Sequence, residues 1–141
     1  MKLSKKTLQI LKNYSSLNSG ILFKPGKILS TRTVNGVAYS EAEIEDLITN
    51  EFGIYDLNNF LTLIDLMGDA SFNLDPFTNE LIITNGKSTL LYPTANPSSI
   101  VFPKKRLEFP TAEVIFELKS ELLTEINRVA RAMGADVLVF E

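Results

Sequence analysis

Internal repetition is the feature that most constrains the fold of this 141-residue chain. The segment LSKKTLQILKN at residues 3–13 aligns with YDLNNFLTLID at residues 55–65. In this alignment Leu8 pairs with Phe60 at an offset of 52. Because both segments carry apolar residues at helical spacing, the alignment predicts two equivalent amphipathic helices.

Residues that start and interrupt elements recur as well. Ser4 and Asp56 stand directly before the two helical segments, where a side-chain oxygen can accept hydrogen bonds from the free amides of the first turn. Pro25 matches Pro76 at an offset of 51. These landmarks agree with the helical alignment, so chance similarity is a poor explanation.

Turn signals repeat after each helix. Asn-Gly stands at residues 35–36 and again at 85–86, an offset of 50. Asn-Gly between apolar runs predicts a hairpin with a type I′ turn. Around these turns lie the strand-like runs GILFK, KILSTRTV and VAYSEAEI in the first copy, and ASFNL, ELIITN and STLLYP in the second. Each copy therefore predicts a short strand, a helix and three antiparallel strands, which makes an α+β fold.

A third copy begins near the end of the chain. FELKSELLTEINRVARAMG at residues 116–134 repeats the strand–helix opening, and ADVLVFE at 135–141 predicts one more strand. The three prolines and the basic triplet of residues 96–110 indicate an extended connector. We therefore expect a first domain at 1–95, this connector, and the incomplete start of a second domain at 111–141.

The charges are distributed unevenly along the sequence. The net charge is −3, but residues 1–40 carry seven Lys/Arg and no Asp/Glu. Residues 41–103 carry one basic residue against ten acidic ones, and residues 104–141 carry six against seven. Such asymmetry concerns partners rather than the fold, and it suggests that the N-terminal part meets an anion.

Basic side chains gather on the polar faces of the first and last helices. A helical wheel places them opposite the apolar residues. The candidate residues are Lys2, Lys5, Lys6, Lys12, Arg128 and Arg131. The competing interpretation is an ordinary solvated face, and the two arginines also suit the C-terminal half of a helix. If nucleic acid is bound, we expect contacts with its backbone only, because no motif for base readout is present.

The sequence favours a protein without catalytic activity. It contains no Cys and no His, so a thiol nucleophile and the usual general base are missing. No phosphate-binding or nucleophile-elbow motif occurs. The carboxylates of residues 41–46 alternate as on the exposed side of a strand, which is favoured over a metal site or a small enzyme built on them. We expect no catalytic residue, no metal, no cofactor and no membrane span.

The sequence also resembles a known family along essentially its whole length. The stretches MKLSK, LKN, NSGI, TR-VNG-Y-EA, IYDLN-FL, PSS-V, FP-A and K-E-L---NRVAR resemble the N-terminal portion of the DNA polymerase processivity clamp of T-even-type bacteriophages. The resemblance implies the DNA-clamp fold, with two strand–helix–three-strand repeats in each domain. It also implies a ring of three subunits that encircles duplex DNA, with helices lining the hole.

Further expectations follow from this resemblance. The six basic residues would face DNA without sequence preference. The partners would be the phage DNA polymerase, a clamp loader and late-transcription factors, in the cytoplasm of the infected bacterium. The alternative is an interaction module with the clamp fold that binds replication proteins without encircling DNA.

Two protein-binding segments are also implied. In clamps the connector borders a pocket for partner peptides, so Ile100, Val101 and Phe102 are candidates for its apolar lip; fastening the connector to the sheet is an equal alternative. Subunits would join through the last strand of domain one, at Ser88, Thr89, Leu90, Leu91 and Tyr92. Since its partner strand would lie beyond residue 141, we expect this chain not to close the normal homotrimeric ring by itself.

Overall fold

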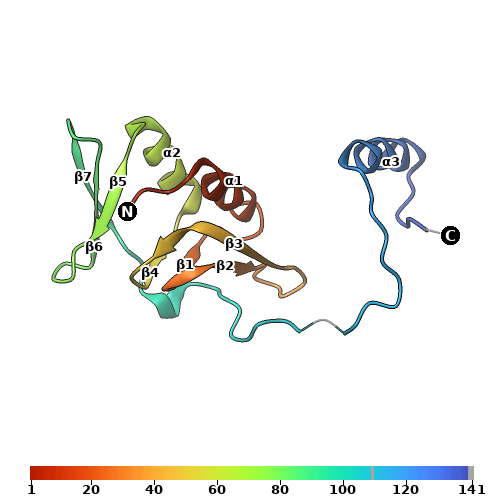
Figure 1. Ribbon diagram of the computed structural model, residues 1–141, viewed down its shortest axis with the longest axis horizontal. Helices are drawn as coiled ribbons and strands as arrows, with labels where there is room; N and C mark the ends of the chain where they lie inside the picture. The colour runs from red at the N-terminus through yellow and green to blue at the C-terminus, as the bar shows by residue number, and fades with distance from the viewer. Residues whose placement is uncertain (109, 140–141) are drawn as a thin grey trace. The chain divides into compact units, whose positions relative to one another are not determined.

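The computed structural model in Figure 1 describes residues 1–108 and 110–139. The elements in chain order are α1 (Lys5–Tyr14), β1 (Ile21–Phe23), β2 (Gly26–Arg32), β3 (Tyr39–Ile48), β4 (Phe52–Ile54), α2 (Leu57–Met67), β5 (Ser71–Leu74), β6 (Glu80–Thr84), β7 (Thr89–Pro93), the 3-10 turn η1 (Pro97–Ser99) and α3 (Ser120–Met133). They form two compact units, Met1–Arg106 and Leu107–Glu141, which are described separately. The expected domain boundaries themselves remain a prediction.

The first unit has a helical layer over antiparallel strands. Helices α1 and α2 pack against each other, and α1 also packs on β3 (Figure 1). The strands form the pairs β1–β4 and β2–β3 and the three-stranded sheet β5-β6-β7. This arrangement confirms the predicted α+β class and both predicted hairpins.

The two copies exchange their opening segments. β4 opens the second copy, yet it pairs with β1 of the first, where Gly53 stands opposite Leu22. In return the Phe72 amide donates to the Met1 carbonyl at 2.7 Å, and the Met1 amino group donates to the Phe72 carbonyl at 2.5 Å. Met1 and Phe72 lie at repeat offsets of 52 and 50 from Gly53 and Leu22. The pairing is therefore reciprocal, and neither copy is complete without the other.

A chain of aromatic rings joins the copies inside the core. Phe23 stacks on Phe52 with 4.6 Å between ring centroids, and Phe52 meets Phe72 edge-on at 6.1 Å. Phe60 lies edge-on to Phe72 at 5.9 Å and to Tyr92 at 5.5 Å. Edge-to-face contacts of this length add to the hydrophobic stabilisation of burial. Helix α2 is thus held down by rings from three different strands.

The repeated helices differ in the face that they bury. Phe60 is fully buried, whereas its predicted equivalent Leu8 is only partly buried. Counted from its first residue, α1 buries positions three, seven and ten, and α2 buries positions one, four and eight. These residues are Thr7, Leu11 and Tyr14 in α1, and Leu57, Phe60 and Ile64 in α2. Equal spacing from the helix cap did not ensure equal burial, because each helix rotates to suit its own neighbours.

The turn type predicted for the hairpins is wrong. Gly36 and Gly86 adopt positive φ angles of 73° and 84°, but Asn35 and Asn85 do not. A type I′ turn needs positive φ at both central residues. The asparagines instead act through their side chains, since Asn85 Oδ1 accepts from the amides of Lys87 and Ser88. This local hydrogen bonding is what makes asparagine a turn residue here.

The second unit contains one regular element, α3. The strands expected on either side of α3 do not form in residues 116–119 and 135–139, and residues 140–141 of that prediction lie outside the described chain. A β-strand is held by hydrogen bonds to a neighbouring strand, and the described part of this unit offers none. The apolar residues expected to face inward on α3 are exposed or only partly buried.

Candidate nucleic-acid interface

The first turn of α1 carries positive charge where a helix tolerates it least. Ser4 caps the helix as predicted, accepting the Thr7 amide at 3.2 Å. Lys5 and Lys6 follow at once, and the first turn contains no acidic residue. Cations at this end oppose the helix dipole, by about 0.3–1 kcal/mol each at exposed positions. Their position is unfavourable for the helix itself, which points to a role in binding.

Asp46 of β3 supplies the negative charge that this helix end lacks. Its Oδ2 accepts the Ser4 amide at 2.9 Å. Burial raises the pKa of the Asp46 carboxyl, but hydrogen bonds from the Thr7 hydroxyl and from the backbone and side chain of Ser4 outweigh it and leave the pKa lowered. Sequence reasoning placed Asp46 only among strand carboxylates, since no local signal indicates a partner 42 residues away.

Replacing Asp46 by Asn should make stability less dependent on pH. The variant retains an acceptor for Ser4 but loses the charge, and we expect a loss of roughly 1 kcal/mol at neutral pH, limited by partial exposure. Because the folded-state pKa is lowered, this stabilisation exists above the unfolded-state pKa and disappears as the pH falls through the folded-state value. Urea unfolding at neutral and acidic pH measures both. An equal wild-type–variant difference at both pH values would contradict the assignment.

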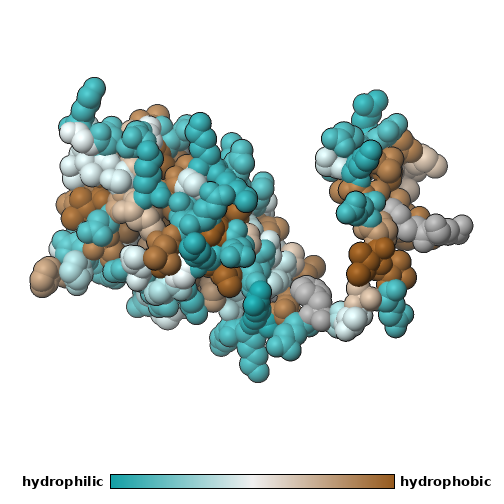
Figure 2. Space-filling model, in the orientation of Figure 1, coloured by the Kyte–Doolittle hydropathy of each residue, from teal (hydrophilic) through white to brown (hydrophobic). Residues whose placement is uncertain are grey.

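All four candidate lysines of the N-terminal region are exposed, as predicted. Lys2 forms an ion pair with Asp69, and the Nζ atom of Lys6 lies 3.8 Å from Glu45 Oε1. Both pairs are solvent-exposed, and such pairs are weak enough to exchange for a phosphate. Within the described residues, Lys5 and Lys12 have no carboxylate at ion-pair distance. Figure 2 shows a largely hydrophilic surface over this part of the first unit.

A shallow groove of about 360 Å³ runs between α1 and α2. Lys12 lies on one side of it, with Asn58, Thr62 and Asp65 of α2 on the other. These polar residues of α2 were expected to accompany the lysines. The groove therefore combines a cation with neutral hydrogen-bonding groups, and its one acid, Asp65, lies on the opposite helix. Such a mixture suits loose contact with a polyanion better than tight capture of a small ligand.

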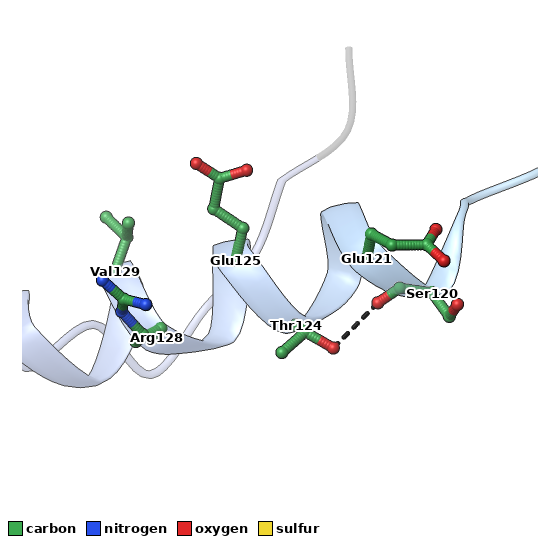
Figure 3. A pocket seen from close by; sticks show the side chains of 6 residues that line it. All are labelled: Ser120, Glu121, Thr124, Glu125, Arg128 and Val129. Carbon is green, nitrogen blue, oxygen red and sulfur yellow. Dashed lines mark hydrogen bonds between the residues drawn. The ribbon is translucent and has the colours of Figure 1, made fainter.

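The predicted polar face of α3 is also formed. Thr124, Asn127, Arg128 and Arg131 line one hollow along the helix. Figure 3 shows that the Thr124 hydroxyl bonds the Ser120 carbonyl, at 2.8 Å, and that Glu121 and Glu125 extend from another side of the helix. The two arginines thus share a face with neutral residues, as the sequence indicated. Whether this face joins the lysines of α1 in one surface remains a prediction.

The carboxylates of residues 41–46 do not converge. Glu41 accepts the Tyr39 hydroxyl at 2.7 Å and pairs with Arg106 at 2.6 Å, while Glu43 and Glu45 are exposed. In the described ranges 1–108 and 110–139, no three acidic residues are grouped in a way that could hold a metal ion. No helix in the same ranges is long and apolar enough to cross a membrane.

The connector packs on the first unit, and Ile100 corrects part of the lip prediction. Ile100 is only 8% exposed, so its side chain is not presented to a partner. It fills the space above Gly20 and Gly53, and Asn18 Nδ2 holds the Val101 carbonyl at 2.8 Å. Ile100 therefore fastens the connector to the strands, which was the alternative interpretation. Val101 and Phe102 remain partly exposed, and the Lys24 ammonium lies 4.5 Å from the Phe102 ring centroid.

Substituting Gly53 by Ala should detach this connector. A methyl group there would lie 2.9 Å from the Ala95 carbonyl oxygen and 3.1 Å from Ile100 Cγ1, so the backbone of the connector must move. We expect destabilisation of about 1–3 kcal/mol from the overpacking. Hydrogen exchange at the Ala95 amide, which bonds the Gly53 carbonyl at 2.8 Å, reports detachment directly. Unchanged protection of that amide in the variant would refute the expectation.

The predicted subunit-interface strand lies at the edge of a sheet. β7 pairs with β6, and in the described chain no strand covers its other edge. Leu90 and Tyr92 turn toward the core, while Leu91 is 58% exposed on the outer face. Ser88 and Thr89 at its start are exposed as well. An uncovered edge with an outward leucine is able to accept another strand.

Comparison with known proteins agrees with these features. A family model described as DNA polymerase processivity factor matches residues 2–102. The sliding clamps of Escherichia phage RB69 and Enterobacteria phage T4 are 44% and 41% identical over 138 residues, which is 98% of this chain and 60% of each relative. The sliding clamp of Vibrio phage KVP40 is 28% identical over 145 residues, covering 99% of this chain and 64% of that relative. The chain thus spans about three fifths of the length of these relatives, and it belongs to the DNA polymerase processivity factor family.

Proposed function

We propose that this protein is a sliding clamp that encircles duplex DNA and tethers a phage replicative polymerase. The role is not enzymatic: it holds the polymerase on its template. The observation that carries the proposal is the lysine face of α1, where Lys5 and Lys12 are exposed and have no acidic partner at ion-pair distance in the described chain. Family membership directs that face toward DNA.

The physical properties of this face suit sliding. Contacts between lysines and phosphates are independent of sequence and weaken steeply with salt. A clamp needs many weak contacts, because one tight contact would stop it at a fixed position. Lys2 and Lys6 add to this surface by exchanging their weak ion pairs for phosphates, and Arg128 and Arg131 are the corresponding residues of the second unit.

The remaining assignments follow from the same role. The exposed edge of β7, from Ser88 to Tyr92, is the subunit contact of a homotrimeric ring. Val101 and Phe102 form the apolar border of the site for the polymerase's tail peptide. A clamp loader opens the ring in the infected bacterial cytoplasm, and late-transcription factors use the same peptide site.

A second candidate is an interaction module that binds replication proteins and leaves DNA free. The partly exposed connector residues Val101 and Phe102 favour it, because a peptide could dock there without a ring. The two candidates differ in their affinity for DNA, since only the clamp uses the lysines of α1.

Binding of the chain to a short duplex at low ionic strength tests the proposal. Fluorescence anisotropy should show weak binding that does not depend on base sequence. The logarithm of the affinity should fall linearly with the logarithm of salt concentration, with a slope of about −0.9 for each phosphate contacted. An affinity that does not change with salt, or no binding beside intact binding of a polymerase tail peptide, would favour the interaction module.

A further inference from the structure

We propose that the second unit, Leu107–Glu141, is a docking surface for a second copy of this chain. The two third-copy segments would complete each other as the first two copies do within the first unit. The inference concerns association of the polypeptide with itself and does not depend on binding of DNA.

The first observation is the uncovered apolar side of α3. Leu122, Val129 and Met133 are 47%, 51% and 77% exposed. Leu122, Ile126 and Val129 occupy positions three, seven and ten of α3, and these are the positions that α1 buries in the first unit. Figure 2 shows hydrophobic side chains on the surface of the second unit. A helix of this kind is built to be covered.

The second observation is the reciprocal pairing found in the first unit. There the opening segment of each copy pairs with the first strand after the helix of the other. The third copy has both parts: an opening segment with Val114 and Ile115, and a segment after the helix with Val137 to Val139. These residues are exposed and form no strand in the described chain. What each segment lacks is an antiparallel neighbour, and a second third copy supplies it twice over.

The charge pattern of α3 makes the helix complementary to itself. Glu121 and Glu125 lie in its first half, and Arg128 and Arg131 lie in its second half. Two such helices related by a two-fold axis across their length run antiparallel, so the acidic half of each lies along the basic half of the other. An isologous contact of this kind uses the same patch on both partners and closes at two subunits. The occupant favoured by the structure is therefore a second copy.

Sedimentation analysis of the full chain tests this inference. We expect a reversible species of twice the 15.7 kDa chain mass at high protein concentration. Val129→Glu places a charge on the apolar side and should weaken association at least tenfold. Asn127→Glu introduces the same residue two positions away on the polar hollow of α3, and its association should equal that of the wild type. Because both variants place Glu in α3, a shared loss of helix would be recognised.

Two further measurements keep the inference falsifiable. Hydrogen exchange in α3 should slow as the concentration of the wild-type chain rises, and it should stay fast in Val129→Glu at every concentration. Leu91→Glu on β7 separates this contact from the proposed ring interface and should leave the dimer intact. The inference is overturned if the chain stays monomeric at the highest concentration reached. It is equally overturned if Leu91→Glu abolishes association while Val129→Glu does not.

Discussion

Reversing the charges of Lys5 and Lys12 together should abolish measurable binding of duplex DNA at moderate salt. Both side chains are exposed, and neither has a carboxylate at ion-pair distance in the described residues. Each lysine that contacts a phosphate contributes about 0.9 to the salt slope, so the slope should fall by roughly twice that amount. The affinity at low salt should fall by at least about tenfold, because two attractions become repulsions.

The same substitution should leave the fold intact. Glu at position 5 lies in the first turn of α1, where an acid interacts favourably with the helix dipole, by about 0.3–1 kcal/mol. Weaker binding together with unchanged or higher stability would exclude unfolding as the cause. Stability is measured by urea unfolding of the same preparation used for the anisotropy titration.

A matched control comes from the strand side of the first unit. Lys27 of β2 and Lys87 of the β6–β7 turn are exposed, and their replacement by Glu changes the net charge by the same amount. If only the total charge matters, both double variants lose affinity equally, and the proposed interface is wrong. If the α1 face is the contact, Lys27→Glu/Lys87→Glu retains most of the affinity and most of the salt slope.

The largest effect on stability is expected from Phe60→Ala. Phe60 is fully buried and meets both Phe72 and Tyr92 edge-on. Removing a buried aromatic ring costs about 3–5 kcal/mol, which is a large fraction of the stability of a small domain. The loss should appear as a lower urea midpoint with an unchanged slope, recorded by near-ultraviolet circular dichroism.

Phe77→Ala is the matched control for that substitution. Phe77 is 95% exposed, in the turn between β5 and β6, so its removal should change the free energy of unfolding by less than about 0.5 kcal/mol. A small effect of Phe60→Ala, similar to that of Phe77→Ala, would mean that the aromatic chain does not join the two copies as described.

Much of the architecture could be read from repetition alone. The caps Ser4 and Asp56, the two hairpins and the exposed lysine side of α1 follow from local sequence, because helix starts, turns and amphipathic faces depend on residues a few positions apart. The basic residues of the candidate interface were found for the same reason. A polar face is a property of one helix and needs no knowledge of its neighbours.

What the sequence missed depends on residues far apart in the chain. Asp46 meets Ser4 across 42 positions, and Ile100 is buried over Gly53 although the connector suggested exposed apolar residues. The strands expected around α3 had the right composition but no neighbour in the described chain, and a strand cannot be held without one. Composition indicates what a segment is suited to form, and a partner decides whether it forms.

The sequence by itself therefore determined the repeated α+β unit, the caps of its first two helices and the placement of lysines on the outer side of α1. The tertiary structure alone decided that the copies exchange their opening segments, that Asp46 balances the charged end of α1, and that Ile100 closes over Gly53. The physical reason is range. Helix periodicity and capping are set within a few residues, whereas strand pairing, burial and charge compensation depend on which distant residues the folded chain brings together.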